Sequence, residues 1–151
     1  MLKLSLLGPF IATLEDQLID NFKTQKVQAL LITLAMEPDR PHRRESLMAI
    51  LWPEMPLESA QVNLRQTIYR LRQSIPDVQT KAGNSLVPLL VSDRLTVSIH
   101  PDAAIWVDVH QFQEALENNP EDAVSIYRGS FLVDFYLIDS GPFEAWAQQI
   151  R

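Results

Sequence analysis

The stretch LESAQVNLRQTIYRLRQS, from Leu57 to Ser74, decides the fold because it predicts one long amphipathic helix. Its apolar residues recur every three or four positions, so they share one buried face. That face consists of Ala60, Leu64, Ile68, Leu71 and Ile75. The opposite face holds Val62, Asn63, Arg65, Gln66, Tyr69, Arg70 and Gln73, with no carboxylate among them. Because amide and guanidinium groups can hydrogen-bond both base edges and phosphates, this face predicts contact with nucleic acid.

The preceding stretch HRRESLMAILWPEMP, residues 42–56, predicts a shorter helix that ends at Pro53. Leu47, Ile50 and Leu51 lie on one face of this helix. Two helices joined by a short turn, the second one basic and exposed, are typical of a helix-turn-helix. The same pattern also fits a solvated surface helix that binds no ligand, and that alternative remains open.

The remaining N-terminal elements predict a winged helix. Short apolar runs at 2–6 and 10–14, with a third at 18–19, indicate a small antiparallel sheet. Thr24 can cap a helix that ends before Pro38, and its buried stripe is Val27, Leu30, Leu31 and Leu34. Residues 77–85 are expected to be a polar connector. Residues 86–91 and 95–99 are expected to form one hairpin, the wing, around the tip Ser92-Asp93-Arg94.

A boundary is expected at Pro101-Asp102, which gives a winged-helix domain at 1–100 and a helical domain at 101–151. Asp108 is expected to cap the first helix of that second domain. A second helix is expected from about Glu121 to Arg128, and a third in FEAWAQQIR, residues 143–151. Since the chain stops within this third helix, we expect it to be a truncated piece of a longer protein. The predicted fold class is therefore α+β.

Composition and charge set further limits. The 151 residues are 46% hydrophobic and include no cysteine, which excludes disulfides and thiolate metal sites. The N-terminal run is interrupted by Gly8 and Pro9, unlike a signal peptide or membrane span, so we expect a cytoplasmic protein without membrane contact. The net charge of −6 is uneven, because residues 23–72 carry eight Lys or Arg against five acids. Residues 100–151 carry two Arg against nine acids, so only one part of the chain favours phosphates.

Catalytic and metal sites are not expected. The histidines His42, His100 and His110 match no compact ligand spacing. Four glycines, at 8, 83, 129 and 141, provide no phosphate-binding loop, and no serine elbow or HExxH motif occurs. We therefore expect a binding protein with no enzyme activity, no metal and no cofactor.

Six stretches that cover nearly the whole chain carry a family pattern: LLGPF, KVQALLITLA, RRESLMAILWPE, SAQVNLRQTIYRLR, SDRLTVSIHPDAAIWVDVHQFQEAL and YRGSFLVDFYLIDSGPFEAW. Together they resemble the Streptomyces antibiotic regulatory protein (SARP) family. The resemblance implies an OmpR-like winged-helix DNA-binding domain. It also implies that the C-terminal part is the start of a bacterial transcriptional activator domain, an all-α module of TPR-like helical repeats.

The resemblance implies that residues 57–74 enter the DNA major groove as the recognition helix. Arg65, Gln66 and Tyr69 then contact bases or backbone, and Arg70 and Arg72 hold phosphates, with Asn63 and Gln73 on the same helix. Arg94 of the wing would enter the minor groove, although Asp93 beside it weakens the local field. Independently of the resemblance, Arg43 and Arg44 begin a helix where the dipole disfavours cations, which suggests phosphate contacts. Arg72 could instead pair with Glu58 or another acid.

These observations predict a sequence-specific DNA-binding transcription activator. Its expected partners are double-stranded DNA, then RNA polymerase or other proteins through the helical region, and a second copy on repeated half-sites. The alternative is a winged-helix protein-interaction module within a larger signalling protein, whose third helix docks a partner through Val62 and Tyr69. The arginines Arg65, Arg70 and Arg72 discriminate between these hypotheses, since only a DNA reader depends on them.

Overall fold

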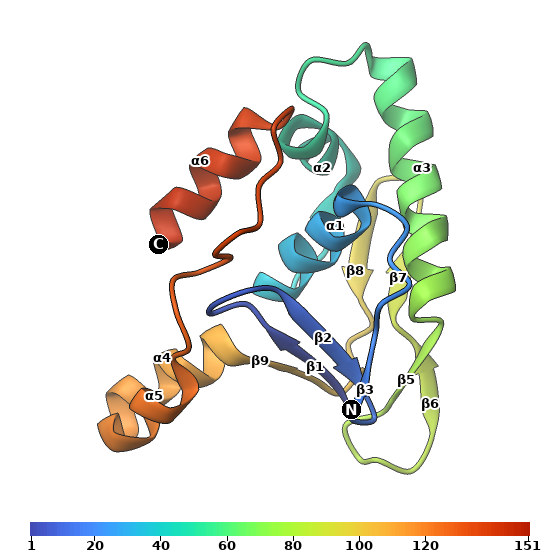
Figure 1. The fold of residues 1–151 in the computed structure, drawn as a ribbon. Helices are drawn as coiled ribbons and strands as arrows, with labels where there is room; N and C mark the ends of the chain where they lie inside the picture. The colour runs from blue at the N-terminus through green and yellow to red at the C-terminus, as the bar shows by residue number, and fades with distance from the viewer.

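The structure, a computed structural model, describes residues 1–151 as a mixed α/β fold with six helices and several small sheets (Figure 1). The N-terminal sheet contains β1 (Leu2–Ser5), β2 (Ile11–Leu14), β3 (Gln17–Leu18) and β9 (Ile105–Val107), in the order β3-β2-β1-β9. The pairings β1–β2 and β2–β3 are antiparallel, as predicted. The parallel pairing of β9 with β1 was not predicted from the sequence.

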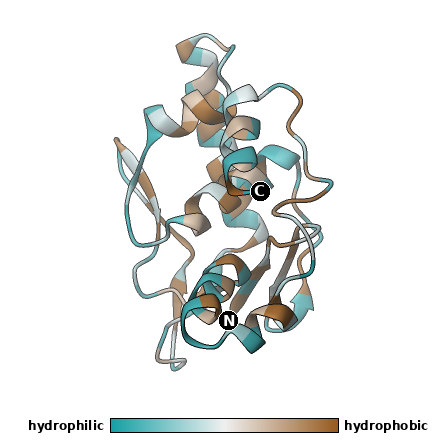
Figure 2. Ribbon diagram, turned by 90° about the vertical axis from the view of Figure 1, so that its left-hand side faces the viewer, coloured by the Kyte–Doolittle hydropathy of each residue, from teal (hydrophilic) through white to brown (hydrophobic).

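Three helices follow the first sheet: α1 (Gln25–Met36), α2 (Arg44–Leu51) and α3 (Leu57–Ser74). Thr24 caps α1 as predicted, because its hydroxyl accepts a hydrogen bond from the Val27 N–H at 3.3 Å. The bounds of α3 agree with the prediction, and the whole apolar stripe from Ala60 to Ile75 is buried. Helix α1 contacts both α2 and α3. The ribbon alternates between hydrophobic and hydrophilic bands along these helices, as amphipathic helices around a core should (Figure 2).

The prediction that residues 86–91 and 95–99 form one hairpin is wrong in one respect, because residues 77–99 form two hairpins. Strand β5 (Asp77–Gln79) pairs with β6 (Leu86–Pro88), whereas β7 (Leu90–Ser92) pairs with β8 (Thr96–Ile99). The chain changes partners at Leu89, whose N–H donates to the Pro76 carbonyl and whose own carbonyl accepts from His100. Leu89 and Leu90 are both buried, which breaks the alternation of a single strand. Strand β4 (His42–Arg43) completes a three-stranded sheet, in the order β4-β8-β7.

The C-terminal part contains α4 (Asp108–Asn118), α5 (Pro120–Ile126) and α6 (Gly141–Ile150). The prediction that Asp108 caps α4 is wrong, since the N-cap is Val107 and no side chain caps the helix. The Asp108 carboxylate instead accepts hydrogen bonds from the backbone N–H groups of Leu6 and Leu7, at 2.8 and 2.9 Å. The physical reason is that β9 lies parallel to β1 and delivers Asp108 to the backbone just beyond the end of β1.

One hydrophobic cluster spans both halves of the chain. It includes Leu2 and Leu4 of the first sheet, Leu30 of α1, and the C-terminal Phe131 and Phe143. Residues 131–140, called the strap here, run from the α4–α5 pair back to α6, and α6 contacts α2 (Figure 1). The expected boundary at Pro101-Asp102 stays a prediction, and β9 beyond it belongs to the N-terminal sheet.

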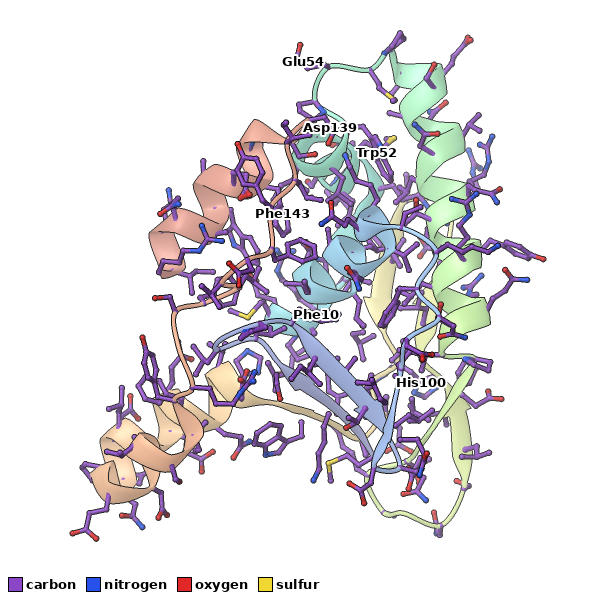
Figure 3. The ribbon with its side chains drawn as sticks, viewed as in Figure 1. Phe10, Trp52, Glu54, His100, Asp139 and Phe143 are labelled. Carbon is purple, nitrogen blue, oxygen red and sulfur yellow. The ribbon has the colours of Figure 1, made fainter.

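The strap is attached to the helices through Lys26 of α1. The Lys26 ammonium donates to the Ser140 hydroxyl at 2.8 Å and to the Leu51 carbonyl, and it lies 3.2 Å from an Asp139 carboxylate oxygen. The Ser140 hydroxyl also donates to the Leu51 carbonyl at 2.6 Å. Trp52 and Asp139 are neighbours in this junction (Figure 3), and the Lys26 ammonium lies 5.3 Å from the Trp52 ring centroid.

None of the helices combines the length and the apolar composition that a membrane-spanning helix needs.

Candidate nucleic-acid interface

The exposed surface of α3 divides into three parallel strips, since successive residues are about 100° apart around a helix. A hairpin-facing strip contains Leu57, Gln61, Arg65 and Arg72. A central strip contains Val62, Gln66, Tyr69 and Gln73, all of them exposed. A far strip contains Asn63 and Arg70, both half-buried. Many side chains with nitrogen tips project from the free side of α3 (Figure 3). The arginines of the two outer strips flank a central strip that has no charge, and the exposed Glu58 of the first turn lies between the hairpin-facing strip and the central strip.

A groove of about 760 Å³ lies between the start of α2, the first half of α3 and the turn of the β7–β8 hairpin. Four arginines line it, namely Arg43, Arg44, Arg65 and Arg94. Its carboxylates are Glu45 and Asp93, so arginines outnumber acids by four to two. The structure thus brings together cations from β4, α2, α3 and the hairpin turn, which are up to 51 residues apart in the sequence. Such a groove suits a polyanion.

The carboxylate of Asp93 holds the hairpin turn. It accepts hydrogen bonds from the backbone N–H of Leu95 at 2.8 Å and of Thr96 at 2.7 Å, and from the Thr96 hydroxyl at 3.2 Å. These hydrogen bonds, chiefly the one from Leu95, lower the pKa of Asp93, because they favour the charged carboxylate. The charged carboxylate of Asp93 therefore stabilises the turn. This structural role explains why an acidic residue lies next to Arg94 in a groove lined by arginines.

Three of the predicted arginines have partners within the chain. The Arg44 Nε donates to the Asp93 carbonyl at 2.9 Å, and an Arg72 terminal nitrogen donates to the Ser92 hydroxyl at 2.9 Å. Arg72 therefore does not pair with Glu58, and its side chain reaches across to the hairpin instead. Arg43 lies 3.3 Å from Glu45, but both side chains are more than 60% exposed. An ion pair this exposed is weak, which leaves Arg43 able to exchange partners.

The other candidate residues fall into two groups. Asn63 donates from Nδ2 to the Met55 sulfur at 2.9 Å, so its amide is turned toward the loop between α2 and α3. Gln73 donates from Nε2 to the Tyr69 hydroxyl at 3.0 Å. The side chains of four further candidates have no hydrogen bond or ion pair within the chain: Arg65, Gln66, Arg70 and Arg94.

Sequence reasoning missed Gln61 and Ser92, which also line the groove. Gln61 lies one helical turn before Arg65, and that spacing was a signal that both face the hairpin. Ser92 was assigned only to the hairpin tip, and nothing in the local sequence links it to Arg72, twenty residues earlier.

The histidines occupy separate positions and do not form a cluster. The Nε2 atoms of His42 and His110 each lie 2.9 Å from a carbonyl at the end of α1, Glu37 and Met36 respectively. Burial lowers the pKa of His42, because the charged imidazolium loses solvation there. No group of three or more histidines and carboxylates has the arrangement of a metal site.

The chain was compared with protein families, curated proteins and solved structures. No protein-family model matches the chain, and no curated protein matches it. Among solved structures, the chain is similar to Mycobacterium tuberculosis EmbR in complex with a low-affinity phosphopeptide, with a TM-score of 0.70 and 21% identity. The alignment covers 98% of this chain and 41% of the EmbR chain. At this identity the likeness shows that the chain has an EmbR-like fold.

Proposed function

We propose that this chain is the DNA-binding part of a bacterial transcription regulator, and that residues 1–100 act as a winged helix with α3 as the recognition helix. The likeness to EmbR supports the regulator class, because it extends over almost the whole chain. The observation that carries the proposal is the pattern of α3 and the groove: an uncharged central strip lies between cations on both sides.

This pattern fits the geometry of B-DNA. The major groove is about 12 Å wide and admits one α-helix, with a phosphate backbone along each of its edges. In the proposed complex the central strip faces base edges, with Gln66 as the main hydrogen-bonding residue. Arg65 then lies toward one backbone and Arg70 toward the other. Since phosphate contacts fix position and base contacts provide specificity, the charges belong at the flanks.

The groove extends the proposed contact beyond α3. Arg43 at the start of α2 and Arg94 in the hairpin turn lie with Arg65 around one space. A phosphate backbone passing through this groove would meet all three guanidinium groups. In this proposal the hairpin acts as the wing and Arg94 is its DNA-contacting residue.

The C-terminal helices complete the proposed activator. We propose that the acidic part after residue 100 contacts RNA polymerase or another protein, and that two copies bind repeated half-sites. The acid-rich sequence of that part suits contact with a basic protein surface better than with DNA. EmbR was solved with a bound peptide, which supports protein partners for this class of chain.

One observation favours the alternative, a module that docks a protein on α3. Val62 and Tyr69 are 53% and 57% exposed at the centre of the helix surface, and exposed apolar side chains can mark a protein interface. The two hypotheses differ in their dependence on charge. Protein docking through this strip should be weakened by Val62→Ala and be nearly independent of salt.

The test is a salt titration of binding to a fluorescent pool of DNA duplexes, comparing the native chain with the Arg65→Ala/Arg70→Ala variant. Direct phosphate contact predicts that the logarithm of affinity falls steeply with the logarithm of salt concentration. The slope should shrink by about one to two units in the variant, because each phosphate contact contributes about 0.9.

A matched control is the Lys3→Ala/Lys81→Ala variant, which removes two exposed cations from parts of the chain outside α3 and the groove. This control should keep the native slope. Equal slopes for all three proteins, or native binding that does not respond to salt, would contradict the proposed role of α3.

A further inference from the structure

The turn of the β7–β8 hairpin is held from two sides by two different helices. Arg72 of α3 donates to the Ser92 hydroxyl at 2.9 Å, and Arg44 of α2 donates from Nε to the Asp93 carbonyl at 2.9 Å. The backbone N–H of Arg44 also donates to the Leu95 carbonyl at 2.8 Å. Two helices thus meet consecutive residues of one exposed turn.

Arg94 is the exception within this turn. Ser92, Asp93, Leu95 and Thr96 all take part in hydrogen bonds, whereas none is found for Arg94. Its neighbours are fixed, and its own side chain stays free at the edge of the groove. A cation presented in this way loses less conformational entropy on binding, because its backbone is already ordered.

We infer that Arg44 and Arg72 are positioning residues that hold the hairpin turn so that Arg94 reaches DNA, and that they do not themselves contact phosphate. This inference rests on the DNA binding proposed above, and it divides the arginines into two roles. Arg43, Arg65 and Arg94 contact the polyanion, while Arg44 and Arg72 hold the turn that carries Arg94.

The position of Arg72 on its helix supports this division. It lies about 20° from Gln61 around α3, which puts it on the hairpin-facing strip and away from the central strip. Its hydrogen bond to Ser92 then turns the guanidinium group toward β7. A long cationic side chain whose end is fixed in the gap between two elements serves as a link between them.

The first test needs no DNA. Trypsin cleaves after Arg94 only when the turn opens, so the rate at which the fragment ending at Arg94 forms reports local opening. Ser92→Ala removes the acceptor of Arg72 and leaves every charge in place. It should raise this rate about threefold to tenfold, the effect of losing one hydrogen bond.

Two hairpin variants serve as controls. Ser92→Thr keeps the hydroxyl and should cleave like the native chain. Ser98→Ala removes a hydroxyl from the same hairpin, one whose only hydrogen bond is a long contact of 3.5 Å to the Val91 carbonyl, and it should also cleave like the native chain. If Ser92→Ala also cleaves at the native rate, the hydrogen bond from Arg72 does not hold the turn and the inference is wrong.

The second test is the salt titration with the duplex pool, in the Arg94→Ala background. If Arg72 acts only through Arg94, adding Arg72→Ala to that background leaves affinity and salt slope unchanged. A further loss of slope of about 0.9 would show that Arg72 contacts a phosphate itself, which would overturn the inference. If the native chain binds no duplex, the proposed function fails together with the DNA part of the inference. Faster cleavage of Ser92→Ala would still establish the link between α3 and the turn.

Discussion

Two cationic regions of this molecule have opposite surroundings. At the junction between α1 and the strap, Lys26 is only 16% exposed, and its ammonium group contacts a carbonyl, a hydroxyl, a carboxylate and an aromatic ring. On α3 and the hairpin turn, Arg65 and Arg94 have no partner within the chain. The comparison indicates that a cation satisfied by its own chain stabilises the fold, whereas a free cation beside a groove is available to a ligand.

The largest effect should come from the core beneath the strap. Phe143 of α6 is fully buried and packs against Phe135 and Trp146. Phe143→Ala should lower the free energy of unfolding by about 3–5 kcal/mol, because it removes a buried ring and leaves a cavity. Urea unfolding followed by tryptophan fluorescence measures the loss. As a control, Tyr136→Ala in the strap should cost far less, since Tyr136 is 60% exposed. Similar losses for both variants would mean that the strap does not pack as the structure has it.

A smaller effect is expected at the Lys26 junction. Lys26→Met keeps the apolar stem but removes the hydrogen bonds to Ser140 and the Leu51 carbonyl. The cost should be about 1.5–3 kcal/mol of unfolding free energy, the usual value for a hydrogen bond to a charged group. Asp139→Asn should cost much less, because the Asp139 side chain is 63% exposed and its ion pair is screened by water. If Arg65→Ala lowers the free energy of unfolding as much as Lys26→Met does, then Arg65 also stabilises the fold and the distinction between the two cationic regions is wrong.

Sequence reasoning predicted α3 to the residue because eighteen residues keep one periodicity without a proline or glycine. It failed where contacts depend on distant residues. Asp108 resembles a helix cap locally, but its hydrogen bonds go to residues about one hundred positions earlier. The strand β5 has only three residues, too few for any pattern to separate it from a loop. The same division holds at the candidate site. The exposed arginines of α3 follow from the local helical pattern and were predicted, whereas the hydrogen bond from Arg72 to Ser92 joins residues twenty positions apart and was not.

The smallest effect concerns Asp93 and pH. Hydrogen bonds from the backbone of the turn lower the pKa of Asp93 below its ordinary value of 3.8, so the carboxylate stabilises the turn while it is ionised. This contribution is fully present above pH 3.8 and is lost as the pH falls through the lowered folded-state value. NMR titration of the Asp93 carboxyl carbon, with the amide signals of Leu95 and Thr96, should give a shared midpoint below 3.8. Asp93→Asn should abolish the common transition of those amides. A midpoint at or above the ordinary value would mean that this carboxylate does not hold the turn, and the backbone on either side of Arg94 would then be fixed only by the hydrogen bonds from Arg44 and Arg72.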